Sequence, residues 1–108
     1  MASSPFETLA DRTLQAILAR VEDRLGDEVE ADLNGGILTI ELAGGGKYVL
    51  NKHSPNRQIW LSSPVSGAAH FDWHAESGEW RSTRGGETLL VRLAQELSAA
   101  TEIEIAFG

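Results

Sequence analysis

The stretch that decides the fold occupies residues 51–64 and reads NKHSPNRQIWLSSP. In a strand, successive side chains point to opposite faces, so Ile59 and Leu61 fall on one face and Trp60 on the other. The apolar pair is expected in the core, which turns Trp60 outward. An aromatic residue inside a polar ring is typical of a protein interface. The alternative, in which Trp60 packs beneath the loop at 62–67, fits the alternation equally well.

Short strand-like segments continue on both sides of this stretch, each bounded by Gly, Pro, Ser or Asn. Together with 58–62 they predict about six antiparallel strands. The Asn34-Gly35-Gly36 run favours a tight hairpin turn between the first two. The further segments are 29–33, 37–42, 47–52, 69–74 and 79–82.

Amphipathic helices are expected at both ends of the strand region. Apolar residues recur at three- and four-residue steps over 6–25 and 89–100, and Gly26 is a stop signal for the first helix. The order predicts an α+β two-layer sandwich in which two terminal helices pack on one face of an antiparallel sheet. Its length, 108 residues, favours a single domain over 1–108. The end of the chain is expected in the groove between the helices, where it would bury Ile103, Ile105 and Phe107.

Composition narrows the classes of function. Sixteen acidic and nine basic residues give a net charge of −7, which disfavours binding to nucleic acid. No apolar run is long enough to span a membrane. The absence of cysteine excludes disulfides, thiolate zinc sites and cysteine ligation of an iron–sulfur cluster. The N-terminus lacks the pattern of a secretory signal or a transit peptide. The lack of cysteine is compatible with a reducing, cytosol-like compartment, and a cytoplasmic location is expected.

Acidic residues gather on the first helix and the first strand, where they are expected to form a ridge along one edge of the fold. Carboxylate oxygens are hard ligands that suit iron(II), manganese, magnesium or calcium. Such a ridge would bind cations weakly and with little selectivity. A merely solvated charged face is the commoner explanation for such a run. The ridge residues are Glu7, Asp11, Glu22, Asp23, Glu30 and Asp32.

A second set of potential ligands, His70, Asp72 and His74, shares one strand face. Residues two apart on a strand lie nearly 7 Å apart at the backbone, which makes a tight three-ligand metal site awkward. Solvated polar side chains account for this set more simply. The serines near Trp60 lack the Gly-x-Ser-x-Gly elbow of a hydrolase.

The run 51–64, continued by Ser66-Gly67 and by the His70-Phe71-Asp72-Trp73 sequence, resembles the signature of the frataxin family. The similarity is ungapped over more than twenty positions and centres on QIWL at 58–61. The order helix, strands, helix and the acidic first helix extend it over most of the chain.

The resemblance implies an iron-binding accessory or regulator of iron–sulfur cluster assembly that docks on a cysteine desulfurase and a scaffold protein. Iron would be the bound metal, weakly held, on the acidic ridge defined above. The partner surface would be a sheet face centred on Trp60. By resemblance its residues are Asn51, Lys52, Gln58, Trp60 and His70.

The resemblance also leaves alternatives open. Some frataxins are credited with ferroxidase activity, so the chain could instead oxidise and store iron. The acidic face could also serve only as an electrostatic contact for a basic partner. A monomer is expected, with iron-driven oligomers as a further option, and a mitochondrial matrix location is the alternative to the cytoplasm.

Overall fold

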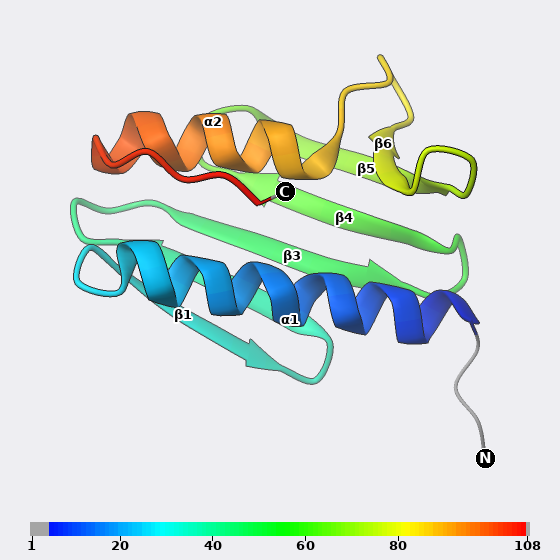
Figure 1. The fold of residues 1–108 in the computed structure, drawn as a ribbon, viewed down its shortest axis with the longest axis horizontal. Helices are drawn as coiled ribbons and strands as arrows, with labels where there is room; N and C mark the ends of the chain where they lie inside the picture. The colour runs from blue at the N-terminus through cyan, green and yellow to red at the C-terminus, as the bar shows by residue number, and fades with distance from the viewer. Residues whose placement is uncertain (1–4, 108) are drawn as a thin grey trace.

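The computed structural model describes residues 5–107, and within that range the chain forms two helices and six strands (Figure 1). Every expected element is present, with ends that differ from the expected ones by no more than two residues. The elements are α1 (Pro5–Leu25), β1 (Val29–Asn34), β2 (Ile37–Leu42), β3 (Lys47–His53), β4 (Gln58–Ser63), β5 (Gly67–His74), β6 (Glu79–Ser82) and α2 (Leu89–Thr101).

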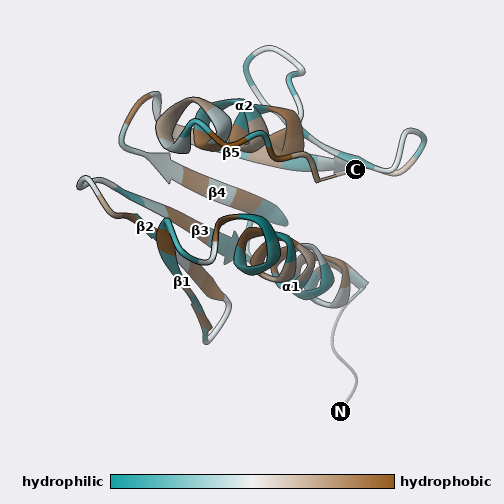
Figure 2. Ribbon diagram, turned by 60° about the vertical axis from the view of Figure 1, so that its left-hand side comes forward, coloured by the Kyte–Doolittle hydropathy of each residue, from teal (hydrophilic) through white to brown (hydrophobic). Residues whose placement is uncertain are grey.

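The six strands form one antiparallel sheet in the order of the chain, β1 to β6. Both helices lie on the same side of this sheet, α1 over its β1 half and α2 over its β6 half (Figures 1 and 2). The predicted α+β sandwich is therefore confirmed. None of the helices among residues 5–107 is long and apolar enough to cross a membrane.

Alternation along each strand sends apolar side chains to the face that the helices cover. Tyr48 and Phe71 are the largest fully buried side chains there, with Ile59 and Leu61 beside them. Trp80 is also buried and Trp73 partly buried, as expected for the core side. Burying a large apolar side chain contributes about 1.5–3 kcal/mol, so this face supplies most of the driving force for folding.

Two glycine sites shape the β1 edge. A Cβ at Gly26 would stand 2.6 Å from the carbonyl oxygen of Glu22, so the chain can leave α1 at this angle only without a side chain. At the β1–β2 turn, Gly35 and Gly36 both have positive φ, 61° and 80°, which a two-residue hairpin of this hand requires. That turn fixes the register in which Glu30 stands opposite Glu41.

The end of the chain occupies the groove between α1 and α2, as expected (Figure 1). Ile105 is buried there, while Ile103 and Phe107 pack partly buried against the core. Arg20 and Arg24 of α1 donate to the carbonyl oxygens of residues 106 and 104. Side-chain donors from the helix thus satisfy tail carbonyls that no strand could reach.

The loop after β4 is tied to α2 by a carboxylate. Glu96 accepts hydrogen bonds from the hydroxyls of Ser63, at 2.5 Å, and Ser66, at 2.7 Å. The Ser63 oxygen in turn accepts from the backbone N–H of Val65. These hydrogen bonds therefore tie the loop after β4 to α2, on the covered side of the sheet.

Candidate functional site

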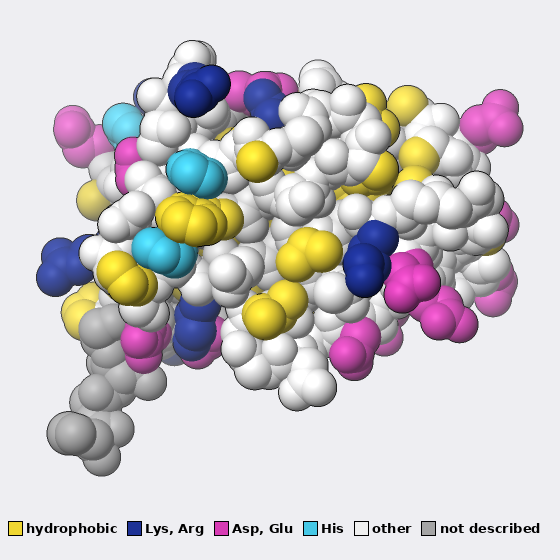
Figure 3. Space-filling view, turned by 180° about the vertical axis from the view of Figure 1, so that it is seen from behind, with side chains coloured by type: hydrophobic (Ala, Val, Ile, Leu, Met, Phe, Trp, Pro, Cys, Tyr) yellow, Lys and Arg dark blue, Asp and Glu magenta, His cyan; other side chains and the backbone are white. Residues whose placement is uncertain are grey.

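The sheet face that no helix covers carries a stack of three rings centred on Trp60. The His53 ring lies nearly parallel to the indole, with ring centroids 3.8 Å apart and an interplanar angle of 11°. The His70 ring stacks at 4.3 Å and 14° from the neighbouring strand on the other side. Figure 3 shows histidine side chains above and below a hydrophobic group on this face. The two imidazoles account for the partial burial of Trp60.

Hydrogen bonds fix the edge of the same indole. Trp60 Nε1 donates to Gln58 Oε1 at 2.8 Å, and Gln58 Nε2 donates to Asp72 Oδ1 at 3.0 Å. An indole can only donate and a carboxylate can only accept, so the Gln58 amide has one satisfying orientation. Gln58 therefore positions Trp60, and Asp72 positions Gln58.

Asn51 and Lys52 are both expected around Trp60, but their side chains lie on opposite faces of the sheet. Asn51 lies directly opposite Trp60 in the β3–β4 register and shares its face. Lys52, one residue later, points to the face that the helices cover, where its Nζ lies 2.9 Å from Asp11 Oδ1. The expectation that Lys52 rims Trp60 is therefore wrong, because strand alternation separates it from the open face.

The expected acidic residues of α1 do not form one cluster. Glu7 accepts a hydrogen bond from the Ser54 hydroxyl and Asp11 is paired with Lys52, both near the start of the helix. Glu22 and Asp23 lie at its far end, about 22 Å from Glu7 by the rise of the helix. There Asp23 stands 3.8 Å from Arg20. Half of the predicted ridge residues thus already contact donors of this chain.

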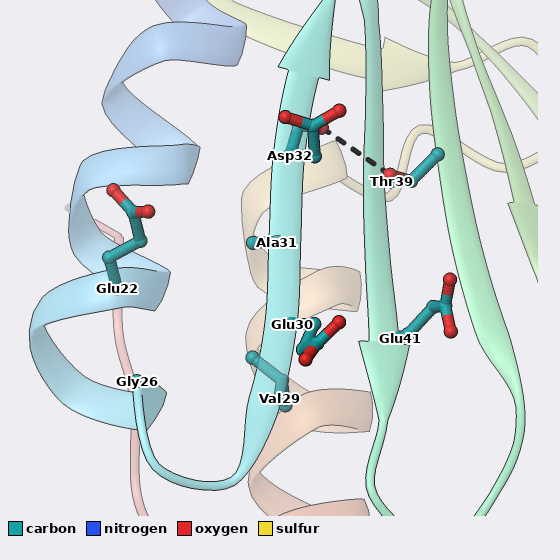
Figure 4. A pocket seen from close by; sticks show the side chains of 8 residues that line it. All are labelled: Glu22, Gly26, Val29, Glu30, Ala31, Asp32, Thr39 and Glu41. Atoms are coloured by element: carbon teal, nitrogen blue, oxygen red, sulfur yellow. Dashed lines mark hydrogen bonds between the residues drawn. The ribbon is translucent and has the colours of Figure 1, made fainter.

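The strand acids lie along the β1–β2 edge, beside the far end of α1 (Figure 4). A hollow of about 380 Å³ there is lined by Glu22 of α1, Glu30 and Asp32 of β1, and Glu41 of β2. Glu30 and Glu41 are direct cross-strand neighbours, and like charges in that position repel. A cation would relieve this repulsion, and carboxylate oxygens suit a hard cation.

The donor set fits loose cation binding better than a closed cage. Among residues 5–107, no three His, Asp or Glu side chains converge closely enough to hold a metal ion. The His70, Asp72 and His74 set shares a face as expected, yet its members serve separately. His70 stacks on Trp60, Asp72 accepts from Gln58, and His74 is exposed.

Sequence reasoning missed two residues that the structure adds to these surfaces, His53 and Glu41. Both could be found from register. The two-residue turn at Gly35-Gly36 makes each opposing pair of residue numbers sum to a constant, which sets Glu41 against Glu30. His53 shares the face of Asn51 because it lies two residues later on the same strand.

Comparison with known proteins identifies relatives of this whole arrangement. The Frataxin-like domain family model matches residues 1–103. Mitochondrial frataxin of Arabidopsis thaliana is 42% identical over 97 residues, covering 85% of this chain and 51% of the relative. The iron–sulfur cluster assembly protein CyaY of Thioalkalivibrio sulfidiphilus is 41% identical over 101 residues and 92% of both chains. This chain thus spans about half the length of the mitochondrial relative.

Solved structures agree with the sequence relatives. The frataxin from Psychromonas ingrahamii superposes with a TM-score of 0.87 at 30% identity, over 100% of this chain and 99% of that one. Trimeric frataxin from Saccharomyces cerevisiae, complexed with ferrous iron, gives a TM-score of 0.74 at 35% identity, over 94% and 89%. The family model covers nearly the whole of this chain, and the structural neighbours have the same fold. The chain therefore belongs to the frataxin family.

Proposed function

We propose that this chain is an iron-binding accessory of iron–sulfur cluster assembly, and that it docks on a cysteine desulfurase and scaffold complex through the open sheet face centred on Trp60. The observation that carries the docking assignment is the fixed, half-buried indole on an uncovered face. A relative at 41% identity is named as an iron–sulfur cluster assembly protein, which supports the process.

Iron is the cargo in this proposal, and the β1–β2 hollow is its favoured place on this chain. Support comes from the repelling pair of Glu30 and Glu41, from Asp32 beside them, and from the ferrous complex of the yeast relative. Carboxylates held apart at a solvent-exposed edge give weak binding and easy release, which suits a protein that delivers or senses iron. We propose the bacterial cytoplasm as the compartment, with the mitochondrial matrix as the alternative.

The docking proposal is tested by binding of the desulfurase and scaffold complex to Trp60→Ala. Truncation of a central aromatic anchor costs 2 kcal/mol or more, so we expect affinity to fall by about 30-fold or more. Val91→Ala is the matched control, because Val91 is an exposed apolar side chain on α2, away from this face. Unchanged binding of Trp60→Ala would remove the docking assignment.

The iron proposal is tested by isothermal titration of ferrous iron, without oxygen, into a triple variant, Glu30→Gln, Asp32→Asn, Glu41→Gln. We expect the heat of binding to fall sharply. A control with the same net charge neutralises three exposed acids elsewhere, Glu76, Glu102 and Glu104. Equal loss in both variants would favour general charge attraction over a located site, which is the electrostatic alternative.

A further inference from the structure

The stack around Trp60 restricts how a partner can reach it. The indole is a flat ring with two faces, and an imidazole covers each of them, His53 from β3 and His70 from β5. A partner ring or guanidinium cannot lie on either face without displacing a histidine. The single indole N–H is also used, because it donates to Gln58. Trp60 can therefore offer a partner only its apolar outer edge.

The polar groups left unused on the stack belong to the imidazoles. Within residues 5–107, neither His53 nor His70 makes a side-chain hydrogen bond, and His70 is exposed. The buried Nδ1 of His53 has no partner, so Nε2 is the nitrogen of that ring which a second molecule can reach. A neutral imidazole whose proton is on the outward nitrogen offers a hydrogen-bond donor to a second molecule there.

The surroundings of the stack favour acceptors on the partner. The one carboxylate bonded into this group, Asp72, accepts from Gln58, and Asn51 adds an amide beside Trp60. The acidic pair Glu30 and Glu41 lies on the same face at the β1–β2 edge, about 14 Å and about 10 Å from β4, respectively, by strand spacing. One end of the face thus offers donors around an apolar edge, and the other end offers carboxylates.

We propose that His53 and His70 determine the specificity of this docking face. The three rings form a single ridge that enters a narrow slot on the protein partner. The edge of Trp60 fills the apolar floor of that slot, and the imidazole N–H groups donate to oxygen acceptors, carboxylates or backbone carbonyls, on its walls. This inference rests on the docking function proposed above.

The geometry of the stack is tested by NMR of the imidazole C–H protons. The chain has three histidines, and His74 is exposed and outside the stack, so it is an internal reference. Ring currents of the indole should move the signals of His53 and His70 upfield of that of His74. Trp60→Leu should return them toward it. Three equivalent signals in the wild type would overturn the proposal.

The specificity of the stack is tested with His53→Phe and His70→Phe. Each variant keeps a flat ring on the indole and removes the N–H groups. Loss of one hydrogen bond, about 0.5–1.5 kcal/mol, predicts about 2- to 12-fold weaker binding to the desulfurase and scaffold complex. His74→Phe is the matched control and should bind as the wild type. Thermal unfolding of each variant confirms that the fold is kept.

The outcomes separate this inference from the function on which it rests. Wild-type affinity in both Phe variants, together with loss in Trp60→Ala, would overturn the role of the histidines and leave the docking function intact. Unchanged binding in Trp60→Ala as well would remove both. A Phe effect that fades with added salt supports carboxylate acceptors, and one that persists supports backbone carbonyls.

Discussion

The two faces of the sheet are stabilised by different kinds of interaction, although the same strands contribute to both. Phe71 is fully buried under the helices, while His70, its neighbour on β5, stacks on Trp60 in the open. The covered face depends on the fit of apolar volumes, where any change in size costs stability. The open face depends on pairs of side chains between adjacent strands. Its residues can therefore change without unfolding the protein, and a binding surface can evolve there.

Truncation of one large aromatic residue on each face should show this difference most strongly. Phe71→Ala leaves a cavity in the core beside Ile59, its cross-strand neighbour, and we expect a loss of about 3–5 kcal/mol of unfolding free energy. Trp60→Ala removes a ring that is only half-buried, so we expect a loss of about 1–2 kcal/mol. Urea unfolding monitored by circular dichroism measures both. Equal losses would mean that the open face also holds the fold together.

Alkaline pH should weaken the covered face through its buried tyrosine. Burial, together with the nearby carboxylate of Glu96, raises the pKa of Tyr48 from 10.0 to about 12. The folded state therefore keeps the phenol proton that the unfolded state loses. The contribution of Tyr48 to the unfolding free energy is complete below pH 10 and is lost as the pH rises to about 12. The unfolding free energy falls by about 2–3 kcal/mol over this range.

The check on Tyr48 is direct because the chain has one tyrosine. Tyrosinate absorbance of the folded protein should titrate near the raised pKa, and urea should restore an ordinary value. In Tyr48→Phe, unfolding free energies measured at about pH 9 and about pH 12 should differ less than in the wild type. A normal titration of the folded protein would contradict the buried position of this hydroxyl.

The covered face could be predicted from the sequence because one variable, burial, decides it. Period-2 alternation assigned Ile59 and Leu61 to the core, and helical spacing assigned the buried side of α1, including Leu14 and Ile17. Such patterns are local, so no knowledge of neighbouring strands is needed. The six strands and two helices followed for the same reason.

The open face could be predicted only in part, because its features depend on which residues become neighbours. Alternation turned Trp60 outward, yet it did not reveal that His53 would stack on it from another strand. Lys52 was assigned to the surroundings of Trp60 although its phase on β3 places it on the covered face. The acidic residues of the first helix were expected to form one ridge, whereas the length of α1 separates Glu7 from Glu22.

Lys52 is the one charged residue of β3 whose side chain lies on the covered side of the sheet. Its ion pair with Asp11 can be tested by substitution. Its side chain is 22% exposed and that of Asp11 is 42% exposed, so solvent screens the pair. Lys52→Met keeps the apolar stem and removes the charge, and we expect a loss of about 0.5–1 kcal/mol. A double-mutant cycle with Asp11→Asn in low and high salt isolates the pair. Additive losses would show that the two charges do not interact in solution.

The smallest effect should come from the repelling carboxylates on the open face, where a single substitution is expected to stabilise the protein. Glu41→Gln removes the like charge opposite Glu30 and should raise unfolding free energy by a few tenths of a kcal/mol, within the range of about 0.2–1 kcal/mol for cross-strand pairs. Glu76→Gln, in the exposed β5–β6 turn, changes net charge equally without such a neighbour.

Divalent manganese, a hard cation that resists oxidation in air, should make the wild type more stable than Glu41→Gln. A cation that binds only the folded state stabilises it by mass action, so the wild type should gain more in Tm than Glu41→Gln. If both proteins gain equally, the cation binds elsewhere, and the open face would keep its docking role without a share in holding iron.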